Sequence, residues 1–453
     1  MRKNTLKYVS TTNACKLCKP LGAALAFRGI AKTVPFLHGS QGCATYMRRY
    51  IISHFNEPID IASSALGEKS AVYGGAANLR LGLKNVTEKY RPELIGLATT
   101  CLTETIGDDV PMILREYYLA AEKEGAVLPA VVHVSTPSYA GTHMEGFHAA
   151  VRAVVEQIAG AGGKNDTINL LPGFVSPADL RHLRAILADF NLAATILPDY
   201  SETLDGQAML DYPRIPEGGT PLSAIRGMGQ ARATLELGRT LPDHSAGVYL
   251  NQAFGVPCQR LGLPIGIRET DLFFAALEKL SDRPAPARLA AVRGRLIDAL
   301  VDGHKYVFGK KAVIYGEEDL VVGLTAFLAE IGIFPVLCAS GGKSGRLAQA
   351  IATVLNGLPV TPPEVREDAD FLEIAERVAE LDPDLLVGHS KGYAIAKKQN
   401  IPLIRVGFPI HDRLGGQRIL HLGYEGAQAL FDLIVNILIA GKQDRSPVGY
   451  SYM

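Results

Sequence analysis

The sequence predicts an α/β protein built from three Rossmann-like, doubly wound parallel-sheet domains. Short apolar runs alternate with helical patterns along the chain, and 453 residues exceed what one hydrophobic core usually supports. At roughly 150 residues per domain, this length suggests about three domains. The 46 glycines fit the many tight strand-to-helix turns of such a fold.

The predicted strands are continuous apolar runs bounded by Gly, Pro or polar residues, a pattern typical of parallel strands buried on both faces. They lie at 93–98, 129–134, 167–172, 193–197, 311–315, 333–338, 384–387 and 402–406. Helical patterns lie between several of them, at 143–159, 177–190, 318–331 and 370–381. This alternation favours βαβ crossovers within parallel sheets.

Two segments mark candidate domain boundaries. The glycine-rich stretch IAGAGGKND covers 158–166, and SDRPAPARLAAVRGRLIDAL at 281–300 is typical of a proline-containing linker that leads into a long helix. We therefore expect domains at residues 1–163, 164–300 and 301–453. Ligands of doubly wound sheets bind beyond the carboxyl ends of the strands, so residues directly after a strand are the first functional candidates.

Charge and hydropathy limit the partners and the location of the protein. Lys plus Arg and Asp plus Glu each total 46, so no net field attracts nucleic acid or an anionic membrane. The N-terminal MRKNTLKYVSTTNACK lacks the apolar core of a signal peptide, and the apolar stretch ALFDLIVNILIAG is short and contains Asp432. We expect a cytoplasmic protein that binds neither nucleic acid nor membrane, whose six cysteines are not disulfide-bonded.

Three cysteines share a position in loops or at helix starts. Cys18 precedes the apolar segment KPLGAALAF, Cys43 ends the motif HGSQGC directly before a predicted helix, and Cys101 follows the predicted strand 93–98. A helix N-terminus lowers the pKa of a thiol and so stabilises the thiolate that iron–sulfur clusters prefer. Three thiolates are one short of an ordinary four-cysteine cluster, so we expect a second chain to complete the site. A packed core thiol is the competing interpretation of each cysteine, and Cys338 in FPVLC is typical of one.

The segments CKPLGAAL, HGSQGC, TTCLTETIGDD and STPSYAGT, in this order, resemble the cluster-binding domain of β-type chains of the nitrogenase component 1 family. Cys43 follows Cys18 by 25 residues and Cys101 follows Cys43 by 58, the separations expected for the β-side ligands of the nitrogenase P-cluster. The segments LPIGIRETD at 263–271, GHSKG at 388–392 and RVGFPIHDR at 405–413 extend the resemblance over nearly the whole chain.

The resemblance implies a homologous α-type subunit, an α2β2 heterotetramer, and an [8Fe–7S] P-cluster or a [4Fe–4S]-type cluster shared between the chains. Cys18, Cys43 and Cys101 are then implied to bind one half of that cluster. Ser138 in STPSYAGT falls where β-type chains have a serine able to ligate iron in the oxidised cluster, with a turn or capping serine as the alternative. The catalytic iron–sulfur cofactor is expected in the α-type chain, with no catalytic residue in this one. Electrons are expected from an ATP-dependent [4Fe–4S] reductase component similar to the nitrogenase Fe-protein.

Four further residues carry weaker expectations. Cys15 forms a CxxC motif with Cys18, which leaves a zinc or redox pair as a less favoured alternative. Cys258 in GVPCQRLG is expected to be a packed thiol. His38 is expected either to hydrogen-bond near cluster sulfurs or to be a structural histidine, and His389 to be structural.

Several members of the family compete as interpretations of the function. Retention of three cysteines favours a catalytic subunit, and we expect methylthio-alkane reductase, which cleaves carbon–sulfur bonds in small thioethers, ahead of nitrogenase itself. A scaffold subunit for iron–molybdenum cofactor biosynthesis is the alternative, although such scaffold chains keep only the cysteine that matches Cys43. Dark-operative protochlorophyllide reductase fits less well, because its B-type chain is expected to offer an aspartate. From another class, a non-enzymatic Rossmann-like binding protein with merely packed cysteines would be colourless.

Overall fold

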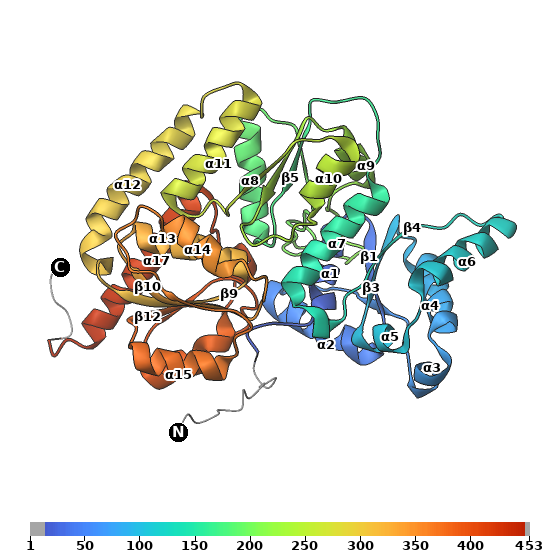
Figure 1. Ribbon diagram of the computed structural model, residues 1–453, viewed down its shortest axis with the longest axis horizontal. Helices are drawn as coiled ribbons and strands as arrows, with labels where there is room; N and C mark the ends of the chain where they lie inside the picture. Colours follow the sequence, from blue (N-terminus) through green and yellow to red (C-terminus); the bar gives the residue numbers. More distant parts are fainter. Residues whose placement is uncertain (1–13, 449–453) are drawn as a thin grey trace.

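Three separate parallel sheets follow one another along the chain in the computed structural model, which describes residues 14–448 (Figure 1). We call the surrounding segments lobe one (14–158), lobe two (168–281) and lobe three (287–448). Every strand pair in the three sheets is parallel, which confirms the predicted fold class. The domain boundaries at 163 and 300 stay a prediction.

Lobe one holds a sheet of order β2-β1-β3-β4 with helices on both faces. Its strands are β1 (Thr33–His38), β2 (Ala62–Ser63), β3 (Leu94–Thr99) and β4 (Ala130–Val134). Its helices are α1 (Lys19–Arg28), α2 (Gln41–Phe55), α3 (Glu68–Tyr73), α4 (Ala76–Tyr90), α5 (Cys101–Ile106), α6 (Val110–Lys123) and α7 (His143–Ile158), with the 3₁₀ turn η1 (Ser138–Ala140). The central strands β1 and β3 are buried along their whole length, as expected for strands covered on both sides.

Lobe two holds a sheet of order β6-β5-β7-β8. Its strands are β5 (Ile168–Leu171), β6 (Ala194–Ile196), β7 (Ala233–Leu237) and β8 (Cys258–Leu261). Its helices are α8 (Pro177–Asp189), α9 (Leu222–Arg226), α10 (Ala246–Phe254) and α11 (Gly266–Ser281), with the 3₁₀ turn η2 (Gly227–Gln230). The predicted linker at 281–300 contains the start of α12 (Ala287–Val307), the long helix expected there.

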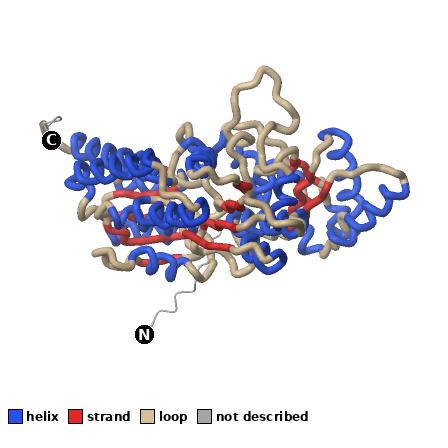
Figure 2. Tube along the Cα trace, turned by 90° about the horizontal axis from the view of Figure 1, so that it is seen from above, coloured by secondary structure: helices blue, strands red, loops and turns tan. Residues whose placement is uncertain are grey.

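Lobe three holds the widest sheet, of order β11-β10-β9-β12-β13. Its strands are β9 (Lys311–Gly316), β10 (Phe334–Ser340), β11 (Glu364–Arg366), β12 (Leu385–Gly388) and β13 (Leu403–Arg405). After α12 its helices are α13 (Glu318–Glu330), α14 (Leu347–Leu355), α15 (Phe371–Leu381), α16 (Tyr393–Gln399) and α17 (Gly423–Asp444), with the 3₁₀ turns η3 (Ser390–Gly392) and η4 (Gly416–Arg418). Seen from above, the lobes form one elongated body (Figure 2).

Aromatic side chains from all three lobes meet at the centre of the molecule. Phe147 of lobe one lies 5.4 Å from Phe174 of lobe two, ring centre to ring centre, and Phe174 lies 5.6 Å from Phe408 of lobe three. The largest hydrophobic core runs without interruption through the three lobes. Burial of this shared apolar surface holds the lobes together.

Several strands were absent from the sequence prediction, namely β1, β2, β7, β8 and β11. Strand β1 contains Pro35 and β7 contains Glu236, and both residue types argue against a buried strand when only the local pattern is considered. The tertiary structure offsets these costs, since Glu236 accepts hydrogen bonds from Ser245 and from the backbone of Gly247. Across residues 14–448, none of the helices has the length and apolarity that crossing a bilayer requires.

Candidate metal centre

The candidate site lies at the carboxyl edge of the lobe-one sheet. Strands β1, β3 and β4 are neighbours in that sheet, and each is followed within five residues by a residue that the sequence singled out. Cys43 lies in the first turn of α2 after β1, Cys101 begins α5 after β3, and Ser138 begins η1 after β4. Parallel strands end at the same edge of a sheet, so the topology brings these three residues into one region.

Cys18 reaches the same region from another direction, through the packing of α1 against α7. A Cβ on Gly22 would lie 1.6 Å from the carbonyl oxygen of His143, and one on Gly146 would lie 1.9 Å from that of Lys19. Only glycine therefore allows the two helix backbones to touch directly after Cys18. This contact fixes the start of α1, where Cys18 is the N-terminal capping residue.

Ser138 connects two of the thiols. Its backbone N–H donates to Cys101 Sγ over 3.2 Å, and its Oγ accepts from the backbone N–H of Lys19, next to Cys18, over 3.2 Å. At the start of α2, Ser40 Oγ donates to Cys43 Sγ over 3.5 Å. Donors of this kind stabilise thiolates, and around a bound iron–sulfur cluster they tune its potential.

The charge environment of Cys18 shows that the three thiols are neighbours. Burial raises the pKa of the Cys18 thiol, and the Ser138 hydroxyl lowers it by hydrogen bonding. The nearby Cys101 and Cys43 raise the pKa of Cys18 further, while the Lys391 ammonium lowers it. Three neighbouring thiolates repel one another, and a positively charged metal group between them removes that repulsion.

All three thiols lie at helix N-termini, as the sequence predicts, with one correction. Cys18 caps α1 and Cys101 is the first residue of α5, but Cys43 is the third residue of α2 and not the residue before it. Helix α2 begins three residues earlier than predicted because Ser40 takes the capping position with extended backbone. The partial positive charge of each helix end still favours a thiolate at these positions.

The donor set fits a metal cluster better than a single ion. Among residues 14–448, no group of three or more His, Cys, Asp or Glu side chains converges tightly enough to hold one metal ion. The atoms of an iron–sulfur cluster extend over several ångströms, so thiols too far apart to share one ion can each ligate a different iron. The three cysteines are also half-buried and free of disulfides, which leaves each sulfur available on one side.

The remaining cysteines have different surroundings. Cys15 is buried, with its Sγ 3.7 Å from His389 Nε2, and burial raises the pKa of its thiol to about 12. Cys338 is buried inside β10, and its thiol contacts the Thr325 hydroxyl at 3.2 Å. Cys258 lies in β8 of lobe two, where burial raises the pKa of its thiol to about 12. Among the described residues, Cys15 and Cys18 form neither a disulfide nor part of a mononuclear site.

His38 takes the structural role that the sequence left open. Its ring is completely buried, with Nδ1 2.9 Å from Ser64 Oγ and Nε2 3.0 Å from Asp108 Oδ2. Burial lowers the pKa of His38, although the Asp108 carboxylate opposes this. This histidine thus ties the end of β1 to the loops around it, and both of its ring nitrogens face partners other than sulfur.

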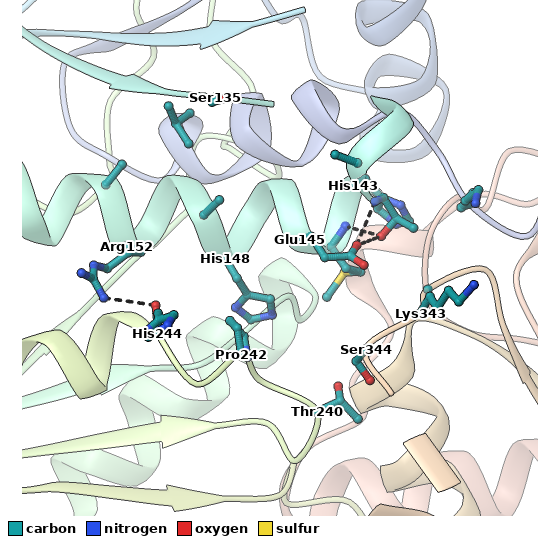
Figure 3. Close-up of a pocket in the computed structure, with 18 of the residues that line it drawn as sticks. Ser135, His143, Glu145, His148, Arg152, Thr240, Pro242, His244, Lys343 and Ser344 are labelled. Atoms are coloured by element: carbon teal, nitrogen blue, oxygen red, sulfur yellow. Dashed lines mark hydrogen bonds between the residues drawn. The ribbon is translucent and has the colours of Figure 1, made fainter. Parts of the chain in front are cut away.

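A cavity of about 1050 Å³ that the sequence did not predict lies between the three lobes (Figure 3). One side of α7 forms one wall, with His143, His148 and Arg152 along it, while Thr240 of lobe two and Ser344 of lobe three lie on the other side. The only signal in the sequence was the helical pattern at 143–159, because the other walls come from segments far apart along the chain.

Comparison with known proteins gives consistent matches over the whole length. A family model described as nitrogenase component 1 type oxidoreductase matches residues 18–439. The molybdenum–iron protein β chain of Clostridium pasteurianum nitrogenase is 35% identical over 431 residues, which cover 94% of this chain and 93% of that one. The vanadium–iron protein β chain of Trichormus variabilis nitrogenase is 36% identical over 455 residues, covering 98% and 97%. A solved structure, nitrogenase Cp1 at pH 6.5, superimposes with a TM-score of 0.94 at 34% identity and covers 98% of this chain and 97% of that chain.

Fold and matches together define a subunit of an oxidoreductase complex, and not the non-enzymatic binding protein considered as an alternative. More specifically, the chain belongs to the nitrogenase component 1 family and is a β-type chain of that family.

Proposed function

We propose that this chain holds one half of a P-cluster through Cys18, Cys43 and Cys101, as the β-type subunit of a nitrogenase-like reductase. The observation that supports this most strongly is the convergence of three half-buried thiols from three separate helix starts at one edge of one sheet. When bound, such a cluster accepts and passes on electrons one at a time between a reductase and a catalytic cofactor.

The residues around the thiols have separate tasks in this proposal. The helix starts at Cys18, Cys43 and Cys101 supply thiolates and the partial positive charge that stabilises them. The Ser138 N–H donates to Cys101 Sγ, and the Ser138 hydroxyl, which accepts from the Lys19 N–H here, would supply an oxygen ligand to the oxidised cluster. Lys391 adds a positive charge near Cys18 from lobe three.

A second chain is needed to complete such a site. Large side chains next to the thiols are exposed, with 40% of Tyr46 and 68% of Tyr139 accessible to solvent. Tyr46 is one helical turn beyond Cys43 in α2, and Tyr139 follows Ser138. An exposed aromatic surface beside half-buried thiols suits a homologous α-type subunit in an α2β2 heterotetramer, with an ATP-dependent [4Fe–4S] reductase component as the electron donor.

The favoured branch is methylthio-alkane reductase, which cleaves carbon–sulfur bonds, followed by nitrogenase. The chain is 35% identical to a molybdenum–iron β chain and 36% identical to a vanadium–iron β chain, so it is equally distant from these two nitrogenase classes. A β chain of a molybdenum or vanadium nitrogenase is expected to be more similar to β chains of its own metal class than to those of the other class. The three retained cysteines favour either reductase over the scaffold subunit of cofactor biosynthesis.

Metal analysis tests the cluster proposal directly. The chain would be co-produced with its α-type partner, purified without oxygen, and assayed for iron and acid-labile sulfide. Beyond the iron of the partner's own cofactor, we expect about four irons per chain, half of a shared eight-iron cluster. A colourless complex without sulfide would overturn the proposal.

Turnover then separates the branches. The complete system would be supplied with ATP and offered dimethyl sulfide or ethylthioethanol in one assay and dinitrogen in another. We expect hydrocarbon release from the thioethers and little ammonia from dinitrogen. Ammonia formation without thioether cleavage would place the chain in the nitrogenase branch, and inactivity of an iron-replete complex on both would favour the scaffold role.

A further inference from the structure

The segment 14–17, which directly precedes Cys18, is anchored on lobe three although Cys18 belongs to the site on lobe one. The backbone N–H of Cys15 donates to the Ala369 carbonyl oxygen over 3.2 Å. Lys391 Nζ donates to the carbonyl oxygen of Lys16 over 3.3 Å. The approach to the first proposed ligand is therefore fixed by a lobe that contributes none of the three thiols.

The last residue of this segment, Leu17, is hydrogen-bonded to both the side chain and the backbone of His143. The backbone N–H of His143 donates to the Leu17 carbonyl oxygen over 3.0 Å, and the Leu17 N–H donates to His143 Nδ1 over 3.3 Å. Both polar backbone groups of Leu17 thus depend on His143. Because Cys18 is the next residue, this two-point contact sets the direction in which the chain enters α1.

His143 is in turn fixed by Glu317. Since Nδ1 accepts a hydrogen bond from Leu17, the proton of the neutral ring is on Nε2, which lies 3.2 Å from Glu317 Oε1 and donates to it. Glu317 follows β9 as the capping residue of α13 in lobe three, and both side chains are buried, with 5% exposed surface each. The imidazole also packs against Phe174 and Phe408, so rotation of the ring is blocked by lobes two and three.

We propose that His143 is a positioning residue for the cluster: it sets the place of the Cys18 thiol relative to Cys43 and Cys101. Glu317 fixes the tautomer and the orientation of the His143 ring that this role requires. The inference rests on the proposed function, because it concerns the same thiols. It extends that function because the position of the Cys18 thiol on lobe one then depends on the hydrogen-bonded pair His143–Glu317 at the junction of the lobes. His143 lies at the start of α7 and borders the cavity between the lobes (Figure 3).

Two isosteric substitutions separate this role from general packing. The amide oxygen of His143→Asn occupies the place of Nδ1 and can accept from Leu17, while the contact to Glu317 is lost. His143→Gln has the opposite effect, since its amide reaches the place of Nε2 and leaves the Leu17 N–H without an acceptor. His148→Gln is the matched control, because His148 lies on the same helix and borders the same cavity but makes no hydrogen bond to residues 15–18.

The first measurement uses the full chain produced without cluster-assembly proteins, so that its thiols are free. Alkylation by iodoacetamide would be followed at each cysteine by mass spectrometry. We expect the ratio of Cys18 to Cys43 modification to change about fivefold in His143→Gln, the equivalent of one net hydrogen bond, and to stay near wild type in His143→Asn and His148→Gln. Equal ratios in His143→Gln and wild type would overturn the proposal.

The second measurement uses the anaerobically assembled complex. We expect His143→Gln and Glu317→Gln to alter the electron paramagnetic resonance spectrum and the midpoint potential of the cluster, and His143→Asn to restore the spectrum towards wild type. Unchanged spectra in the first two variants would contradict the positioning role. If wild type itself binds no cluster, the proposed function fails, yet the alkylation ratios still decide whether His143 positions Cys18.

Discussion

The backbone N–H of Ser138 donates a hydrogen bond to Cys101 Sγ over 3.2 Å, so the loop after β4 holds the thiol that follows β3. The hydroxyl of the same residue accepts from the backbone of Lys19, next to Cys18, and lowers the pKa of the Cys18 thiol. One residue therefore contacts the surroundings of two proposed ligands, through its backbone and its side chain separately. Substitution can separate these two contributions.

Ser138→Ala should leave the reduced protein almost unchanged. The backbone donor to Cys101 remains, so we expect wild-type iron content and a wild-type spectrum after reduction with dithionite. Loss of the hydroxyl removes the proposed oxygen ligand, and only the oxidised state should show an altered paramagnetic spectrum and midpoint potential. If the variant and wild type have identical spectra in the oxidised state, Ser138 acts only through its hydrogen bonds and is no ligand. Loss of iron from the variant in the reduced state would contradict the prediction.

Cys43→Ala should remove the shared cluster and abolish electron delivery without unfolding the lobes, because the thiol lies at the edge of the sheet and not in its core. Iron content, acid-labile sulfide and circular dichroism would be measured together. Cys258→Ala is the control, expected to lower the free energy of unfolding by about 1 kcal/mol and to keep all iron. Retained reductase activity in the first variant, or lost iron in the second, would show that the ligand set is wrong.

Gly22→Ala should destabilise the protein where α1 meets α7. The added Cβ would lie 1.6 Å from the carbonyl oxygen of His143, so one helix must shift, and we expect a loss of about 3 kcal/mol in the free energy of unfolding. Gly294→Ala in α12 is the matched control, since its Cβ meets no atom within 4 Å, and it should stabilise the chain by about 0.5–1 kcal/mol. Thermal unfolding of the two variants would check this, and similar midpoints would argue against the tight contact.

Asp179 gives a pH-dependent test of stability. Burial opposes its ionisation, but His421 and the hydrogen bonds from the backbone of residues 421 and 422 outweigh burial and hold its pKa below the ordinary value of 3.8. Because the pKa is lowered in the folded state, the full stabilisation by the carboxylate is present at pH values well above 3.8. This stabilisation is lost as the pH falls through 3.8 towards the pKa of the folded state.

Asp179→Asn should therefore cost about 3 kcal/mol at pH 7, because it removes a buried carboxylate that hydrogen-bonds to the His421 ring and accepts from the backbone N–H groups of residues 421 and 422. The difference from wild type should shrink steadily as the pH is lowered below 5, which unfolding midpoints in a pH series would measure. A difference that stays constant down to the lowest pH would mean that the cost comes from packing and not from the charge.

Strands were predictable where the evidence lay within a short segment. The runs at 93–98 and 311–315 correspond to β3 and β9 within a residue at each end, because a strand buried on both faces needs uninterrupted apolar residues. Strand β1 was not predicted because Pro35 lies within it. Without β1, the sequence could not show why Cys43 lies at the same edge of the sheet as Cys101. The pair His143–Glu317 left no local trace, since the two residues are 174 positions apart, and the cavity left only the helical pattern at 143–159.

The sequence by itself determined the fold class and the family and singled out the three thiols that we propose as ligands, because apolar periodicity and motif spacing are properties of the chain as written. Only the tertiary structure decided which residues hold those thiols in place. The start of α1 is set by His143, by a glycine contact between two helix backbones and by anchors on lobe three. Such contacts join groups that are distant in sequence, and their energies exist only after the lobes have packed.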